Sequence, residues 1–445
     1  MLCLAWIAHS AAAEALPPAA SLPSATPATP AATWLSAASV DPMTAAPPQA
    51  GEHAIGMPEL IATVLAHNPG LRQAQQASVS AQAAVRGAQV YANPRVDVQV
   101  GRNRARMVGT PTGGAQSWGV AQLIENPAAR QARLDAAQAA AQGSEDGIAL
   151  TRNLLVSDTR ALAAEYLLRR AEAEVLAEEL ALLEDVRERV RVRVSSGEAP
   201  RYEMIKADAE IVQARERVQT TRLQAEQVLV SLNRLAAGHL PARWRVNAQL
   251  QADAEVPAIE TLRQQVADQN PELRILRAEL MRARAQTDGA RASRWPGVEV
   301  RVGQSQEPDV RQTSIGLGVQ VPLFDTRQAA VDEAASEVIR AEGRLEGRQA
   351  ELQQELALAA QSLELARLRV RALGEGVVKD AEAALRVAQA AYKFGERGIL
   401  EVLDAQRVLR GARMELIRAR FQVQSALIDL DTLAGRYSLA SAPQP

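Results

Sequence analysis

The chain has 445 residues, a formal net charge of −2, 47% hydrophobic residues and only 3% aromatic residues. So few aromatic residues leave little bulky material for a large globular core. Alanine, glutamate, arginine, leucine and glutamine dominate instead, as is typical of long helices and coiled coils. Charges of both signs are interspersed and nearly balanced, so we expect no nucleic-acid partner. The single cysteine, Cys3, excludes a disulfide within the chain.

The N-terminal segment is expected to be a signal peptide over residues 1–15. The run from Met1 to Ala13 is uncharged and mostly apolar, and it ends in three alanines, the small residues that signal peptidase requires. A disordered apolar tail is the alternative interpretation. Residues 16–56 predict a disordered leader, because eight of the 22 prolines lie between residues 16 and 50, mixed with alanine, serine and threonine.

Stretches without proline predict long helices. No proline occurs at residues 128–199, 201–240 or 323–442. At about 1.5 Å per residue, a helix from Ala128 to Val194 would be roughly 100 Å long. Its second half carries apolar residues on a seven-residue lattice typical of coiled coils, interrupted only by an arginine: Leu155, Leu162, Arg169, Leu176, Leu183 and Val190. No internal run approaches 18 apolar residues, so no transmembrane helix is expected after the signal.

The sequence is internally duplicated. Residues 68–72, Asn-Pro-Gly-Leu-Arg, recur at 270–274 as Asn-Pro-Glu-Leu-Arg, and after a loop at 102–116 an offset of 198 relates Gly197 to Gly395. Each half is predicted to hold a helix, two strands separated by a loop, a very long helix, a turn and another helix. We therefore expect a first repeat at 57–238, a connecting segment at 239–258, a second repeat at 259–436 and a tail at 437–445.

Short alternating segments predict two strands in each half. Valines alternate with polar residues at 95–100 and 297–302, apolar residues alternate at 315–321, and 116–123 is a weaker strand. The same period of two is found in a half-buried soluble sheet and in a transmembrane barrel. Because about eight strands are the practical minimum for a closed barrel, any barrel here must be shared between subunits.

The duplicated pattern resembles the TolC-type outer-membrane efflux proteins from about Met57 to Arg436. The specific marks are the two Asn-Pro-x-Leu segments, residues 320–325 (Gln-Val-Pro-Leu-Phe-Asp), and Tyr392 and Gly395 followed by residues 401–407. This resemblance implies an α+β membrane protein, a homotrimer in which each subunit gives four strands to a 12-stranded outer-membrane β-barrel in contact with lipid. The long coiled-coil helices would form a periplasmic α-helical tunnel below it.

The resemblance also implies a function without catalysis. Members of the family are outer-membrane exit ducts that reach into the periplasm and work with a periplasmic adaptor and an inner-membrane pump, here of the RND type. Residues 122–133 look like the strand-to-helix junction of the heavy-metal, CzcC-like branch, although Pro127, Ala128 and Ala129 depart from its usual Gly-Lys. Heavy-metal cations are therefore the favoured substrate, with drug, organic-solute or type I protein export as alternatives.

Proteins of other classes share some of these features. A periplasmic coiled-coil adaptor or scaffold would have the helices but would not need strand pairs at equivalent places in a duplicated chain. A helical subunit of an enzyme is disfavoured because the chain has four histidines, no HExxH motif and no Cys/His cluster. We expect no enzymatic activity, no cofactor and no metal site.

Two turns at equivalent places in the halves are the candidate adaptor contacts. Each ends a long helix and contains a glycine, which suits the backbone angles of a tight helix-to-helix turn. The family resemblance places them at the periplasmic tip; a purely structural turn is the alternative. The residues concerned are Ser196, Gly197, Glu198, Gly395 and Glu396.

The candidate gate follows the second turn. Arg397, Glu401 and Asp404 are spaced by four and three residues, which predicts one shared helix face. By the resemblance, Glu401 and Asp404 ring the narrow periplasmic entrance and Arg397 helps to hold it shut. The alternative is an exposed ion pair worth under about 0.5 kcal/mol without a gating role.

Overall fold

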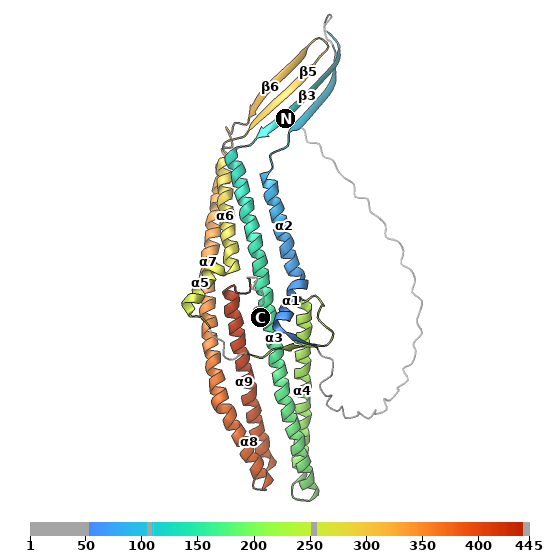
Figure 1. Cartoon of the computed structure of the whole chain (residues 1–445), viewed down its shortest axis with the longest axis vertical. Coiled ribbons are helices and arrows are strands. Elements are labelled where there is room, and N and C mark those ends of the chain that lie inside the picture. Colours follow the sequence, from blue (N-terminus) through green and yellow to red (C-terminus); the bar gives the residue numbers. More distant parts are fainter. Residues whose placement is uncertain (1–52, 105–108, 110, 251–255, 439–445) are drawn as a thin grey trace, which may run out of the picture. The chain divides into compact units, whose positions relative to one another are not determined.

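The computed structural model describes residues 53–104, 109, 111–250 and 256–438. All of them belong to one compact unit, Gly51–Pro445. The expected signal peptide, almost all of the expected leader and most of the tail lie outside the described residues. Within the unit, long helices lie side by side and a separate antiparallel sheet continues from their ends (Figure 1).

The helices of the two halves follow each other in the same order. The 69-residue α3 confirms the predicted long helix of the first half. Its expected heptad positions are buried at Leu155, Leu176, Leu183 and Val190, while Arg169 forms an ion pair with Glu172 on the same helix. The first half contains α1 (Met57–His67), α2 (Pro69–Gln89), α3 (Pro127–Ser195) and α4 (Arg201–Leu235). The second half contains α5 (Ile259–Gln269), α6 (Pro271–Ala292), α7 (Gln328–Ala372), α8 (Val378–Lys393) and α9 (Ile399–Leu433).

The long helix of the second half is not continuous, which corrects the expectation of one very long helix in each half. A π-helical turn, η1 (Leu373–Val377), separates α7 from α8. The sequence of this turn contains Gly374 and Gly376, and an added Cβ at Gly374 would meet the side chain of Leu416 on α9 at 3.8 Å. Single π-turns usually mark one extra residue inside an α-helix.

The repeated asparagines begin equivalent helices. Oδ1 of Asn68 accepts hydrogen bonds from the backbone N–H groups of Gly70 and Leu71, and its Nδ2 donates to the carbonyl oxygen of Leu235 at 2.9 Å. Asn270 makes the same three bonds at the start of α6, with Leu433 as the distant acceptor. Each asparagine thus caps one helix and fastens it to the end of another.

Four strands form one antiparallel sheet in the order β2-β3-β5-β6. Its strands are β2 (Arg95–Asn103), β3 (Gly113–Ile124), β5 (Val298–Gln306) and β6 (Arg311–Val319). The expected weak strand is the 12-residue β3, the longest of the four, and the expected loop at 102–116 is shorter because both neighbouring strands extend into it. Val98 pairs with Trp118, and Gly119 lies opposite Gly303.

Most of the large apolar side chains of this sheet are exposed within the described part of the chain. Val98 is 68% and Leu317 74% exposed, and none of the apolar clusters of the described part contains a residue of these four strands. The described part of the chain therefore gives the sheet no covering apolar layer, unlike a half-buried soluble sheet.

A second, two-stranded sheet was not expected. β1 (His53–Gly56) lies in the expected leader and pairs in parallel with β4 (Trp244–Asn247) of the expected connecting segment. Ile55, Trp244 and Val246 are buried together with residues of α1, α3 and α4. The prediction of a disordered leader is thus wrong for residues 53–56, because β4 offers a strand to pair with and Ile55 packs into an apolar core.

Among the described helices, none has a stretch both long and apolar enough to cross a membrane.

Candidate functional site

The two expected turns have the same backbone geometry. Gly197 and Gly395 both adopt positive φ, at 80° and 77°. In each turn the residue after the glycine donates its N–H to a carbonyl five residues earlier: Glu198 to Arg193 at 2.8 Å, and Glu396 to Ala391 at 3.0 Å. This is the Schellman arrangement that ends helices. An added Cβ would meet nothing within 4 Å at either glycine, so the backbone angle alone demands glycine.

The ends of α3 and α8 that lead into these turns contact each other. The guanidinium of Arg193 lies over the ring of Tyr392, with Cζ 5.0 Å from the centroid. Around this contact, one apolar cluster takes residues from both halves, among them Val190 and Ile211 from the first and Ile399 from the second. The structure therefore brings the two turns to neighbouring places, which we call the tip.

The expected gate residues are only partly brought together. Nη1 of Arg397 donates to Oε1 of Glu401 at 2.7 Å, and this bond raises the pKa of the Arg397 guanidinium. Arg397 lies in the turn before α9 and not on the helix, which corrects the expectation of one shared helix face. Asp404 is exposed on α9 and has no ion-pair partner in the described part of the chain. Since Arg397 and Glu401 are 61% and 45% exposed, the pair by itself is weak.

A row of ion pairs, three of them with a buried glutamate, joins the two halves next to the tip, and sequence reasoning missed it. Glu172 and Glu179 on α3 are only 2% and 3% exposed, yet both are charged partners of arginines on α9. Arg418 donates to Glu172 at 2.9 Å and Arg410 to Glu179 at 2.7 Å. We call these contacts, with those of Arg413 to Glu178 and Arg407 to Glu210 of α4, the ionic seam.

The ionic seam left a signal in the sequence. Glu172 and Glu179 are seven residues apart, so they face the same way on α3, and Arg407, Arg410 and Arg413 recur every three residues on α9. Only three of the 50 basic residues are lysines. The planar guanidinium is the cation best suited to buried pairs with carboxylates, so this composition favoured ion pairs inside a helical interface.

The junction between β3 and α3 is held by two arginines of the segment that resembles the CzcC-like pattern. Arg133 forms two hydrogen bonds with the carboxylate of Glu125, at 3.2 and 2.8 Å. It also donates to the carbonyls of Ala88 and Val90, and Arg130 donates to the carbonyl of Gln89 at 2.6 Å. These carbonyls end α2, where helix C-termini attract cations. The arginines therefore fix the place where the sheet continues into the helices.

The parts of the chain that the structure describes contain no cluster of candidate metal ligands. No group of three or more histidine, cysteine, aspartate or glutamate side chains there could hold a metal ion. His67 and His239 stack with ring centroids 3.9 Å apart, and each Nδ1 lies within hydrogen-bond distance of a backbone carbonyl.

The chain matches one family model and is similar to known proteins. Residues 60–238 and 262–436 match the family model described as outer membrane efflux protein. The cobalt-zinc-cadmium resistance protein CzcC of Cupriavidus metallidurans is 27% identical over 238 residues, which are 53% of this chain and 55% of that protein. The chain thus spans about half the length of this curated relative.

Solved structures share the fold. CusC, whose structure is described in terms of transmembrane channel formation, aligns with a TM-score of 0.70 at 21% identity over 85% of this chain and 91% of that one. The outer membrane protein VceC of Vibrio cholerae aligns with a TM-score of 0.72 at 18% identity over 85% and 96%.

Proposed function

Because the chain belongs to the outer membrane efflux protein family, we propose that it is the outer-membrane exit duct of a tripartite efflux system. A member of this family resides in the outer membrane, reaches into the periplasm and catalyses no reaction. The observation that carries the proposal is the four-stranded sheet with uncovered apolar side chains, continued by helices of which α3 alone is roughly 100 Å long. Strands suited to lipid and helices long enough to cross the periplasm are what an exit duct needs.

We propose further that three chains form one 12-stranded barrel. Four strands cannot close a barrel, and the exposed side chains of Val98 and Leu317 need an apolar surrounding such as lipid. Crosslinking of the detergent-extracted protein should give a ladder that ends at three subunits, and unheated samples should migrate differently from heated ones in gel electrophoresis. A strictly monomeric protein found outside the membrane fraction would contradict the proposal.

The tip is proposed as the contact for a periplasmic adaptor that joins the duct to an inner-membrane RND-type pump. Ser196 tests this well, because it lies beside Gly197 but has ordinary helical angles, so a large side chain there adds no backbone strain. Ser196→Trp should abolish export while trimers remain in the membrane. Ser80→Trp, a change of another exposed serine, on α2, is the matched control and should leave export intact. Normal export by Ser196→Trp would refute adaptor contact at this turn.

Heavy-metal cations are the proposed substrate, with drugs, organic solutes or proteins as the alternatives. The support is the junction around Glu125, Arg130 and Arg133 together with the similarity to a cobalt-zinc-cadmium resistance protein over about half its length. A deletion strain grown on a panel of metal salts and drugs decides between them. Sensitivity to cobalt, zinc or cadmium salts alone supports metal export, whereas sensitivity to drugs alone refutes it.

The gate is proposed at Arg397, Glu401 and Asp404. Three subunits would bring about six carboxylates near one axis, and Arg397 would offset their repulsion through its bond to Glu401. In planar bilayers, Arg397→Ser should raise the resting conductance, and changing Glu401 and Asp404 to alanine should reduce the preference for cations. Arg191→Ser removes an equally exposed ion pair with Glu188 near the first turn and is the control. If the gate variants conduct like Arg191→Ser and the wild type, the constriction lies elsewhere.

A further inference from the structure

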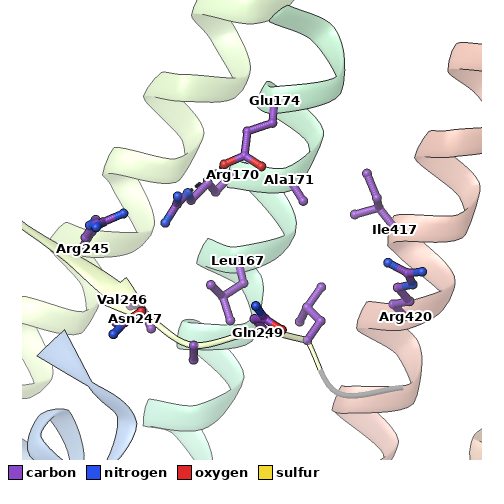
Figure 2. Close-up of a pocket in the computed structure, with 12 residues that line it drawn as sticks. Leu167, Arg170, Ala171, Glu174, Arg245, Val246, Asn247, Gln249, Ile417 and Arg420 are labelled. Atoms are coloured by element: carbon purple, nitrogen blue, oxygen red, sulfur yellow. Dashed lines mark hydrogen bonds and ion pairs between the residues drawn. The ribbon is translucent and has the colours of Figure 1, made fainter. Parts of the chain in front are cut away.

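A cavity of about 420 Å³ lies where the two halves meet beside strand β4. Figure 2 shows its three borders: β4 and the residues after it, helix α3, and helix α9. Leu167, Ala171 and Ile417 supply apolar wall, while Asn247 and Gln249 add amide groups. The volume is within the range of small-molecule sites. None of its lining residues belongs to the tip or to the ionic seam.

Three arginines from three different elements line this cavity. Arg245 lies on β4 between the buried Trp244 and Val246, so the alternation of the strand turns its side chain away from the apolar core. Arg170 comes from α3, and Arg420 reaches in from α9, on the border opposite β4 (Figure 2). Glu174 is the single acidic residue of the lining, which leaves an excess of two positive charges.

Among the residues that the structure describes, one of these arginines has an acidic partner. Nε of Arg170 donates to Oε1 of Glu174 at 3.0 Å. The side chains of Arg245 and Arg420 have no hydrogen-bond or ion-pair partner among the residues that the structure describes. Like charges that face one cavity repel each other, and an anion placed between them removes that cost.

From this arrangement we propose that the cavity binds a small organic anion that carries two or more separate acidic groups. A guanidinium offers a planar fork of N–H donors that matches a carboxylate or a phosphate. Because Arg245 and Arg420 come from opposite borders (Figure 2), a ligand with separated acidic groups is suited to pair with both. The apolar wall suits the carbon skeleton that joins these groups.

Glu174 competes with the ligand in this proposal. Its carboxylate forms an ion pair with Arg170, so this arginine is less available to bind an anion. Removing this negative charge should therefore increase affinity for the anion, which a purely structural ion pair on the helix surface would not do. An increase in affinity in this variant is a more specific result than a loss of binding, because a damaged fold would also cause a loss.

The test is calorimetric titration of the purified full-length protein in detergent at low, constant ionic strength. Citrate and fructose 1,6-bisphosphate are the probes, which distinguish carboxylate from phosphate groups, and inorganic phosphate is the compact control. We expect one of the two probes to bind at one site per chain at least tenfold more tightly than inorganic phosphate. Arg245→Gln and Arg420→Gln should each weaken that binding about tenfold or more, as loss of a charged hydrogen bond does. Glu174→Gln should strengthen it.

Arg222→Gln is the matched control. Arg222 is exposed on α4 and does not line the cavity, so its removal changes the net charge equally without changing the proposed site. The proposal is overturned if neither probe binds, if inorganic phosphate binds as tightly as both probes, or if Arg222→Gln weakens binding as much as Arg245→Gln. Circular dichroism and crosslinking of each variant separate loss of binding from loss of fold.

Discussion

The guanidinium of Arg193 lies over the face of the Tyr392 ring, with Cζ 5.0 Å from the ring centroid. The last turn of α8 in the second half therefore contacts the last turn of α3 in the first half. Tyr392 is buried, and its hydroxyl has no hydrogen-bond partner in the described part of the chain. The aromatic ring therefore stabilises this contact, whereas burial of the unpaired hydroxyl costs free energy of desolvation.

Substitutions of Tyr392 separate these two contributions. Tyr392→Phe keeps the ring and removes the unpaired hydroxyl, so we expect the free energy of unfolding to stay within about 1 kcal/mol or to rise. Tyr392→Ala removes the ring from a packed cluster and should cost about 3–5 kcal/mol. Denaturant unfolding of both variants checks this. A large loss in Tyr392→Phe would mean that the hydroxyl has a partner after all.

The pair of Arg410 and Glu179 should show the asymmetry of buried ion pairs. Arg410→Ala leaves the nearly buried carboxylate of Glu179 with only Arg217 at 3.6 Å, and we expect a loss of about 3 kcal/mol. The double variant Arg410→Met, Glu179→Leu should lose less than Arg410→Ala, because no buried carboxylate is left without its main partner, although Arg217 loses its acidic neighbour. Equal losses in the single and double variants would contradict this account.

The two capping asparagines should differ in energy although their hydrogen bonds are the same. Asn270 is buried, whereas Asn68 is half-buried, so water can replace the side chain of Asn68 more easily. We expect Asn270→Ala to cost about 2–3 kcal/mol and Asn68→Ala about 1 kcal/mol. Thermal unfolding of both variants measures the difference. A larger loss at Asn68 would show that burial does not set the cost.

Glu382 should make stability depend on pH in a defined direction. Arg413 donates to its carboxylate at 2.7 Å, and this bond lowers the pKa of Glu382 below its usual value. A carboxylate with a lowered pKa stabilises the fold above its unfolded pKa, and the contribution is lost as the pH falls through the folded pKa. The effect is small because the pair is partly exposed.

Thermal unfolding of Glu382→Gln and of the wild type, measured over a range of pH, tests whether this contribution to stability is lost in acid. The variant should melt at a lower temperature at pH 7, and the difference should vanish in acid, once the wild-type carboxyl is protonated. A difference of constant size at every pH would exclude the linkage.

Several elements were predictable because their signals are local. The absence of proline and the seven-residue lattice from Leu155 to Val190 predicted α3. The alternating valines predicted β2 and β5. The duplicated Asn-Pro segments marked two helix starts, because asparagine as a cap and proline in the first turn act through neighbouring residues. The positive φ of Gly197 and Gly395 followed from the same local reasoning.

Other features depend on residues that are distant in the sequence. Glu172 meets Arg418, 246 residues away, and no local pattern specifies that distance. The segment His53–Gly56 becomes a strand only because β4 offers an edge and an apolar core receives Ile55. Arg397 was placed on a helix by its spacing, but α9 begins only at Ile399, after Gly398 with extended backbone angles.

The π-turn η1 is a place where the second half can lose one residue without disturbing the packing of its helices. Leu356 and Leu363 are buried seven residues apart before the turn, and Leu385 and Tyr392 are buried seven apart after it. From Leu363 to Leu385 there are 22 steps, one more than three heptads, and η1 absorbs the extra residue. Deleting one residue within Leu373–Val377 would merge α7, η1 and α8 into a single uninterrupted helix with every core leucine still facing inward. The same deletion in the middle of α3 would rotate half of that helix by about 100° and turn its apolar stripe out of the core.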